Sequence, residues 1–230
     1  MSERVVLIAG AAGNLGAAVA QAFARRGARL ALADLNTERL AAQAAELGAF
    51  TYGVNVTDAE QIAGLVAAVQ GRYGRLDVLV NLVGTYRGGK PIHETDPGEW
   101  DFLMNINARS VWLMCRAVVP VMLAQGGGKI VSVAARAGLQ ASRGAAAYAA
   151  SKAAVIRITE SVSLDVRDAG INVNCVLPST IDTPQNREMM PKADPSKWVT
   201  PEQVADAIVF LASEEASGIH GAAVPVYGRA

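Results

Sequence analysis

The chain has 230 residues, 51% of them hydrophobic and 18% charged, and its formal net charge is zero. One α/β domain can reach this length around a single core. The lack of a basic stripe argues against nucleic acid as a partner, and the lack of an uncharged apolar run of about 18 residues argues against a membrane span. The first four residues lead directly into an apolar segment without the features of a signal peptide, so we expect a cytoplasmic protein.

The two cysteines, Cys115 and Cys175, each lie in an apolar segment. This position predicts buried free thiols, as in a reducing compartment. The two histidines, His93 and His220, are far apart, and no cysteine–histidine group has the spacing of metal ligands. We therefore expect no metal site.

Short apolar runs alternate with longer segments of helical character along the whole chain. The near-continuous apolarity of the runs is typical of a parallel sheet that is buried on both faces. The pattern predicts a single α/β domain over residues 1–230, with a doubly wound, seven-stranded parallel sheet and helices on both faces. The expected strands cover residues 5–8, 30–33, 49–52, 78–80, 130–133, 171–176 and 223–226, and the expected helices cover 15–26, 37–47, 58–73, 100–125, 145–168 and 201–211.

Two local signals refine this pattern. Thr200-Pro201-Glu202-Gln203 predicts a capping box with proline at the first helical position. The longest irregular stretch, residues 178–197, follows the sixth strand, and open α/β sheets bind ligands at the carboxyl ends of their strands. We expect this stretch to be a loop that closes over a substrate; the alternative is a passive surface connection.

A glycine-rich turn follows the first strand and precedes a helix. The glycines are Gly10, Gly13 and Gly16, with Asn14 and Leu15 between the last two. Glycines in such a turn let the backbone approach a pyrophosphate and let the helix pack on the strand, while the helix N-terminus offers free N–H groups and a positive dipole. The turn therefore predicts a dinucleotide site of the Rossmann type, with a plain strand-to-helix turn as the alternative.

An acidic residue, Asp34, ends the second strand 18 positions after Gly16, close to the interval of about 20 found in dinucleotide-binding proteins. Its carboxylate, next to Leu35, can accept hydrogen bonds from ribose hydroxyls and would repel a 2′-phosphate. Asp34 and Leu35 therefore favour NAD(H) over NADP(H). The alternative is that Asp34 only begins a turn with Asn36.

Tyr148 and Lys152 are four positions apart and share one face of a helix. A lysine cation stabilises a phenolate and can bring a tyrosine pKa from about 10 towards neutrality. Tyr148 could then exchange a proton with a substrate atom as a hydride moves.

Together with the glycine turn and Asp34, this pair resembles the short-chain dehydrogenase/reductase family over essentially the whole chain. The resemblance implies an NAD cofactor, a small-molecule substrate and a homo-oligomer, either a dimer or a tetramer. Asn107 matches the family's catalytic asparagine, which supports a proton relay to the lysine.

The same resemblance implies further cofactor contacts. Asn55 and Val56 stand where the family encloses the adenine. The segment Asn81-Leu82-Val83-Gly84 keeps two of the four residues of the family's Asn-Asn-Ala-Gly element, and Asn81, Val83 and Gly84 would border the cofactor. The contact with the nicotinamide carboxamide would come from a segment after the sixth strand: Pro178, Ile181 and Thr183.

The sequence departs from the family at one catalytic position. The family usually has a serine 13 residues before the tyrosine, and this chain has Ala135 there. Ser132 lies on the preceding strand and is interpreted as structural, whereas Ser142 lies in the following loop and could reach the site. Loss of a positioned donor costs on the order of a hundredfold in a reaction that forms an oxyanion.

Three functional hypotheses follow. The first is an NAD-dependent oxidoreductase that acts on a small carbonyl/alcohol pair or a quinonoid ring, with Tyr148 as acid/base. The second is a quinonoid dihydropteridine reductase specifically, because residues 177–198 resemble the loop of enzymes that also lack the serine. The third is a non-catalytic NAD(H) sensor, which Ala135 also permits.

Overall fold

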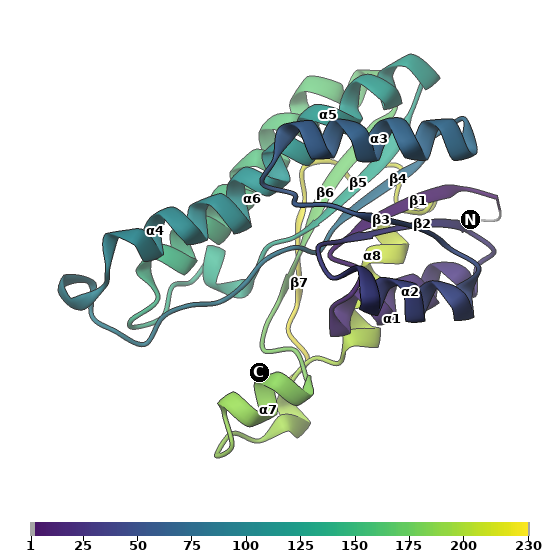
Figure 1. The fold of residues 1–230 in the computed structure, drawn as a ribbon. Coiled ribbons are helices and arrows are strands. Elements are labelled where there is room, and N and C mark those ends of the chain that lie inside the picture. Colours follow the sequence, from purple (N-terminus) through teal and green to yellow (C-terminus); the bar gives the residue numbers. More distant parts are fainter. Residues whose placement is uncertain (1–2, 230) are drawn as a thin grey trace.

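The protein, described over residues 3–229 by a computed structural model, is built on one parallel sheet in the order β3-β2-β1-β4-β5-β6-β7 (Figure 1). Every neighbouring pair is parallel, which confirms the doubly wound arrangement expected from the sequence. The strands are β1 (Val5–Ala9), β2 (Arg29–Asp34), β3 (Phe50–Gly53), β4 (Val78–Asn81), β5 (Gly128–Val133), β6 (Ile171–Pro178) and β7 (Ala223–Val226).

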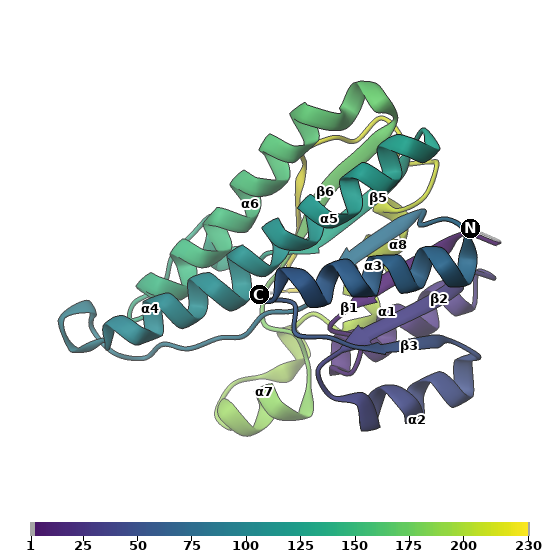
Figure 2. The same ribbon diagram turned by 45° about the horizontal axis from the view of Figure 1, so that its top comes forward.

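Helices cover both faces of the sheet. Figure 2 shows α3, α5 and α6 over one face, with α1, α2 and α8 on the other. The helices are α1 (Asn14–Ala24), α2 (Thr37–Leu47), α3 (Ala59–Tyr73), α4 (Pro97–Leu103), α5 (Ser110–Gln125), α6 (Ala146–Val166), α7 (Pro184–Met189) and α8 (Pro201–Leu211). The three-layer arrangement follows from strands that are apolar on both sides.

The core has two halves, one on each side of the sheet. In β1, Val5, Leu7 and Ala9 face the half that packs on α3, α5 and α6, whereas Val6 and Ile8 face the other half. This alternation is the period of two that a strand imposes on its side chains. All five side chains are buried, so β1 is fixed at the centre of the domain.

The strand order changes direction at β1, which places a crevice at the carboxyl ends of β1 and β4. The chain runs outward from β1 through β2 to β3, then returns to the other side of β1 at β4. Ligands bind open α/β sheets at such a switch point. Gly10 directly follows β1, and Asn81 ends β4 beside Ala9.

Side chains cap most of the helix N-termini. Asn36, Asp58, Asp96, Thr183 and Thr200 cap α2, α3, α4, α7 and α8, and the capping box at Thr200 with Gln203 is confirmed. Helix α1 differs: Gly13 stands at its N-cap and provides no side-chain acceptor. An uncapped helix N-terminus leaves N–H groups available for an anion.

Two expectations for the elements were wrong in detail. The helix expected over residues 100–125 begins at Pro97 and contains a π-helical stretch, Met104–Arg109, between α4 and α5. The irregular stretch expected over residues 178–197 contains helix α7 and a 3₁₀ turn, Pro195–Lys197. Thr183-Pro184 begins α7 as a cap followed by proline at the first helical position, which is a recognised start signal.

The helical stretch Pro97–Gln125 is the one described segment whose length and composition would also suit a membrane span, and half of its most apolar window is buried in the protein. This burial is that of a core helix, because α5 packs on the sheet.

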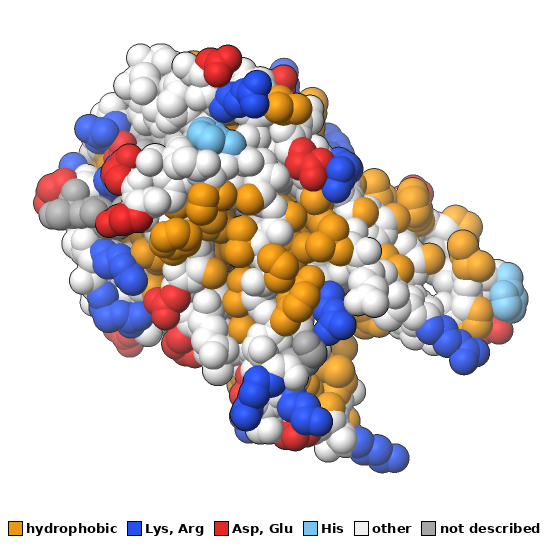
Figure 3. Space-filling model, turned by 180° about the vertical axis from the view of Figure 1, so that it is seen from behind, with side chains coloured by type: hydrophobic (Ala, Val, Ile, Leu, Met, Phe, Trp, Pro, Cys, Tyr) orange, Lys and Arg blue, Asp and Glu red, His pale blue; other side chains and the backbone are white. Residues whose placement is uncertain are grey.

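Figure 3 shows the face opposite to that of Figure 1, where apolar side chains gather across the middle, over α8 and the edge strand β7.

Candidate active site

The glycine turn has the close packing that its sequence predicts. Gly10 has a φ of +86°, and a Cβ atom there would lie 2.9 Å from the amide nitrogen of Val83. A Cβ atom on Gly16 would lie 2.4 Å from the carbonyl oxygen of Ala11. Gly13 is less constrained, since its nearest neighbour would be 3.6 Å away. Gly10 and Gly16 therefore hold the turn against β4 and against the start of α1.

Two observations indicate that this turn fits a dinucleotide. Helix α1 begins beside the turn without a side-chain cap, so the N–H groups at its start, near Asn14 and Leu15, face the crevice without a side-chain acceptor. Across the crevice, Asn81 is buried and donates to Ser132 Oγ at 3.1 Å, while its Oδ1 atom has no partner among the described residues. Buried polar atoms are normally paired, so an orphan of this kind points to a bound group.

Asp34 ends β2 beside the turn, and both of its oxygens accept hydrogen bonds. Oδ2 accepts from the backbone N–H of Ala12 at 3.0 Å, and Oδ1 accepts from that of Asn36 at 3.0 Å. The turn with Asn36 therefore exists alongside the position expected for ribose recognition. Leu35 is 75% exposed next to it.

The other predicted cofactor residues lie along the same edge of the sheet. Asn55 Oδ1 accepts from the backbone N–H and the hydroxyl of Thr57, and Val56 is buried. Pro178 ends β6, and Ile181 forms an isolated bridge with Val199. Thr183 caps α7 through its hydroxyl, a role that the sequence interpretation missed. All five positions lie at or just after the carboxyl ends of β3 and β6.

Asn107 lies within the π-helical stretch and is completely buried. Its Oδ1 accepts from Thr85 N–H at 2.8 Å, and its Nδ2 donates to the Thr85 carbonyl at 3.0 Å and to Ser151 Oγ at 2.9 Å. Ser151 in turn donates to the carbonyl of Tyr148 at 2.8 Å. π-Helical turns of this kind are frequent at functional sites. Asn107 thus joins the segment after β4 to the helix that bears Tyr148.

Gly84 lies close to both Lys152 and Asn107. A Cβ atom on Gly84 would lie 2.9 Å from Lys152 Nζ and 3.0 Å from Asn107 Oδ1. Lys152 is buried and donates from Nζ to the Val133 carbonyl at 2.9 Å. The structure therefore brings Gly84, Asn107, Tyr148 and Lys152 together at the carboxyl edge, although they come from three separate parts of the chain.

The pKa values of the pair differ from the expectation for a lysine-activated tyrosine. Burial, and secondarily the neighbouring Tyr86, raise the pKa of Tyr148 to about 12. Burial lowers the pKa of Lys152 to about 8, although Cys175 acts in the opposite direction. The expected lowering of the Tyr148 pKa by Lys152 is not seen, because Lys152 Nζ is bonded to Val133 and burial dominates. At neutral pH Tyr148 is therefore protonated.

The pKa of Lys152 makes a prediction about stability. Between about 8 and 10.5 the unfolded protein carries a proton on Lys152 that the folded protein has released, so the free energy of unfolding rises with pH in this window. Relative to Lys152→Met, the wild type is expected to gain stability from pH about 7 to about 10, measured by guanidinium unfolding. Lys192→Met, which removes an exposed lysine, is the matched control. A difference that is the same at both pH values would contradict the prediction.

Known proteins share this architecture. A family model described as enoyl-(acyl carrier protein) reductase matches residues 10–228. The 2-(R)-hydroxypropyl-CoM dehydrogenase of Xanthobacter autotrophicus is 37% identical, with 98% of each chain covered. Dehydrogenase/reductase SDR family member 6 of Danio rerio is 35% identical over 99% of this chain and 97% of its own. The chain belongs to the short-chain dehydrogenase/reductase family. A solved structure of an NAD⁺-bound xylitol dehydrogenase is 26% identical, covers 99% of this chain and 98% of its own, and has a TM-score of 0.92.

This short-chain dehydrogenase/reductase has no hydroxyl at residue 135, 13 positions before Tyr148, where the family usually has a serine. Ala135 is 8% exposed and directly precedes the 3₁₀ turn Arg136–Gly138. Ser132 is buried on β5 and accepts from Asn81, as its structural interpretation requires. Ser142 is exposed in the loop before α6 and makes no hydrogen bond to a described residue. Tyr86, which the sequence interpretation missed, packs edge-on against Tyr148 with ring centres 4.9 Å apart.

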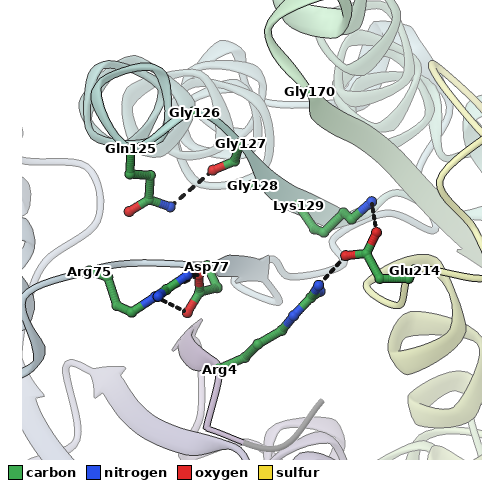
Figure 4. Close-up of a pocket in the computed structure, with 10 residues that line it drawn as sticks. All are labelled: Arg4, Arg75, Asp77, Gln125, Gly126, Gly127, Gly128, Lys129, Gly170 and Glu214. Atoms are coloured by element: carbon green, nitrogen blue, oxygen red, sulfur yellow. Dashed lines mark hydrogen bonds and ion pairs between the residues drawn. The ribbon is translucent and has the colours of Figure 1, made fainter.

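A polar hollow of about 310 Å³ lies at the opposite, amino edge of the same sheet (Figure 4). Its charged side chains pair with one another. Arg75 binds Asp77 at 2.6 Å, Arg4 binds Glu214, and Lys129 lies 3.9 Å from Glu214 and donates to Asn172 at 2.6 Å. Family members bind ligands at the other edge, so we interpret the hollow as structural.

Asp77 makes this interpretation testable. Its buried carboxylate accepts from Val5 N–H at 2.8 Å, as well as from Arg75. Asp77→Ala leaves the buried Val5 N–H without its partner and is expected to cost about 1–3 kcal/mol in the free energy of unfolding. Asp165→Ala, which removes an exposed carboxylate, is the control. Equal stability of the two variants would show that the network does not stabilise the fold.

Proposed function

We propose that the protein is an NAD(H)-dependent oxidoreductase that transfers hydride between the nicotinamide and a small carbonyl/alcohol or quinonoid ring substrate. The observation that carries the proposal is the hydrogen-bonded connection from Thr85 through Asn107 and Ser151 to Tyr148, with Lys152 beside Gly84. This group lies on the same sheet edge as the glycine turn. The family supplies dehydrogenases and reductases with closely similar folds.

The cofactor would be held by residues on both sides of the crevice. Gly10, Gly13 and Gly16 would admit the pyrophosphate, and the N-terminus of α1 would offer its N–H groups to the phosphates. Asn81, Val83, Gly84, Pro178, Ile181 and Thr183 would border the nicotinamide half. When bound, NAD(H) supplies or accepts the hydride.

The proton would be handled by Tyr148. With a pKa raised to about 12 it is protonated at neutral pH, so it suits the reduction direction, in which it donates a proton to the substrate. Lys152 would hold the nicotinamide ribose. At a pH below its pKa of about 8, Lys152 would also place a positive charge near Tyr148. Asn107 and Ser151 would fix the backbone that carries Tyr148.

The preference for NAD(H) would come from Asp34. A carboxylate opposes a 2′-phosphate, and two like charges about 4 Å apart repel by about 1 kcal/mol in water and more in a partly buried site. Asp34→Asn is expected to reduce the preference for NADH over NADPH roughly tenfold. Fluorescence titration with both cofactors gives the two Kd values. A parallel change in both would mean that Asp34 acts only through its bonds to Ala12 and Asn36.

The decisive experiment is turnover. The purified protein is titrated with NADH, and absorbance of the reduced cofactor is followed with a panel of substrates: xylitol and 2-(R)-hydroxypropyl-CoM with NAD⁺, and a set of ketones and quinonoid dihydropterin with NADH. The proposal expects NADH binding and turnover of at least one member. If the protein binds neither NADH nor NAD⁺, the proposal is overturned.

The same substrate panel distinguishes two other functions from the proposed one. Turnover of quinonoid dihydropterin alone would favour a dihydropteridine reductase, for which Ala135 is suited because no alkoxide forms. Tight NADH binding without turnover of any member would favour a sensor. The engaged side chains of Asn107 and Ser151 around Tyr148 support catalysis over sensing.

We also propose that the protein forms a homo-oligomer. Apolar side chains are exposed on three of the outer helices: Trp112 on α5 is 49% exposed, Leu164 on α6 63% and Phe210 on α8 49%. A second copy of the chain would cover such faces, and Figure 3 shows apolar side chains gathered on one side of the protein. Light scattering tests the proposal, and Leu164→Asp and Phe210→Asp identify the face; a monomeric wild type would overturn it.

A further inference from the structure

Tyr86 occupies a place in the active site that neither the motif nor the comparisons explain. It follows Gly84-Thr85 after β4, and its ring stands at 78° to that of Tyr148 with the centres 4.9 Å apart. It is 46% exposed, so one side of the ring faces the space above the sheet edge. Within residues 3–229, neither the Tyr86 hydroxyl nor the Tyr148 hydroxyl has a hydrogen-bond partner.

The position of Tyr86 is fixed from two sides. Asn107 holds both backbone groups of the preceding Thr85, and Gly89 N–H donates to the carbonyl of Gly144 at 2.8 Å, which ties the segment to the start of α6. A Cβ atom on Gly88 would lie 2.8 Å from the Tyr86 hydroxyl, so a bare Gly88 is needed to admit it. A donor held in this way is preorganised, which is what an oxyanion site requires.

The site also lacks a donor at the expected place. Ala135 has no hydroxyl, Ser132 is engaged with Asn81, and Ser142 is exposed in its loop. Unlike Ser132 and Ser142, Tyr86 contacts the ring of Tyr148, and its hydroxyl is not bonded to another described residue. The two rings are in direct contact, with their centres 4.9 Å apart, and Tyr86 is the second cause of the raised pKa of Tyr148.

We propose that Tyr86 donates the hydrogen bond to the substrate oxygen that Ala135 cannot provide. The inference rests on the proposed function. In reduction, the carbonyl carbon accepts the hydride from NADH, the carbonyl π electrons move to oxygen, and that oxygen takes the proton of Tyr148. Tyr86 donates a hydrogen bond to the same oxygen and keeps its own proton, while Tyr148 recovers a proton from solvent.

A double-mutant cycle tests this role. Tyr86→Phe removes only the hydroxyl and is expected to lower kcat on the order of a hundredfold with NADH affinity unchanged. Adding Ala135→Ser to that variant restores the donor and is expected to recover most of the loss, whereas Ala135→Ser alone changes the wild-type kcat little. Tyr52→Phe, on β3 away from the nicotinamide end, is the control for loss of a phenolic hydroxyl.

The pH profile gives a second measurement. Because Tyr86 helps to raise the pKa of Tyr148, the profile of kcat for Tyr86→Phe is expected to move to lower pH. These measurements use the members of the ketone and quinonoid panel that the wild type reduces.

Two outcomes would overturn the inference by itself. Full activity of Tyr86→Phe would do so, and so would an equal effect of Ala135→Ser in both backgrounds. Failure of the proposed function would look different, since the wild type itself would show no turnover or no NADH binding, and this inference would fall with it.

Discussion

Tyr148→Phe is expected to lower kcat about a thousandfold, which lies within the range that a positioned general acid contributes. The variant keeps the ring that packs against Tyr86 and removes only the hydroxyl. The backbone carbonyl of residue 148 still accepts from Ser151, so the fold of this segment should be retained. Steady-state kinetics with the panel substrates provide the measurement, and NADH titration checks that the cofactor still binds.

The comparison with Tyr86→Phe separates two roles for neighbouring phenols. Loss of the proton donor at Tyr148 should exceed loss of the hydrogen-bond donor at Tyr86, because proton transfer completes the reaction. A Tyr148→Phe enzyme with wild-type kcat would show that some other group delivers the proton.

Gly16→Ala is expected to weaken NADH binding about tenfold to a hundredfold, since the turn must shift and lose a hydrogen bond from its backbone to the pyrophosphate, and such a bond to a charged group is worth about 1.5–3 kcal/mol. The added Cβ would lie 2.4 Å from the carbonyl oxygen of Ala11 and 2.5 Å from that of Gly10. Both contacts are backbone atoms, which cannot move without shifting the turn. NADH fluorescence titration measures the loss.

Gly71→Ala is the matched control for this substitution. Gly71 lies in α3, and nothing stands within 4 Å of the Cβ that alanine would add. Alanine there should raise the helix stability by about 0.5–1 kcal/mol and leave NADH binding unchanged. Equal NADH affinity of the Gly16 and Gly71 variants would refute the assignment of the turn.

The elements that local chemistry defines were predictable from the sequence. Apolar runs located all seven strands, because most of these strands are buried on both faces and carry few polar side chains. The capping box at Thr200 located the start of α8, because its signal lies in four consecutive residues. Helix α7 was missed because six residues between prolines carry too little periodicity to signal a helix.

The candidate site was predictable only in part. The Tyr148–Lys152 pair and the glycine turn are local patterns, and the sequence shows them directly. The bonds of Asn107 to Thr85 and to Ser151 join residues 22 and 44 positions apart, so no spacing rule reveals them. The pKa of Tyr148 also escaped prediction, because burial depends on how loop and helix pack and not on the neighbouring lysine alone.

The π-helical stretch Met104–Arg109 carries a consequence for how this site can change by deletion. A π turn accommodates one residue more than the α turn it replaces, so removal of one residue would let the helix continue regularly. Because the π turn already absorbs the extra residue, α4 and α5 would keep their helical phase, and the cation–π contact of Arg87 with Phe102 would be retained. Only the side chains within the stretch would take new directions, so a single-codon deletion beside Asn107 would turn this side chain away from Thr85 and Ser151 while the residue itself is kept.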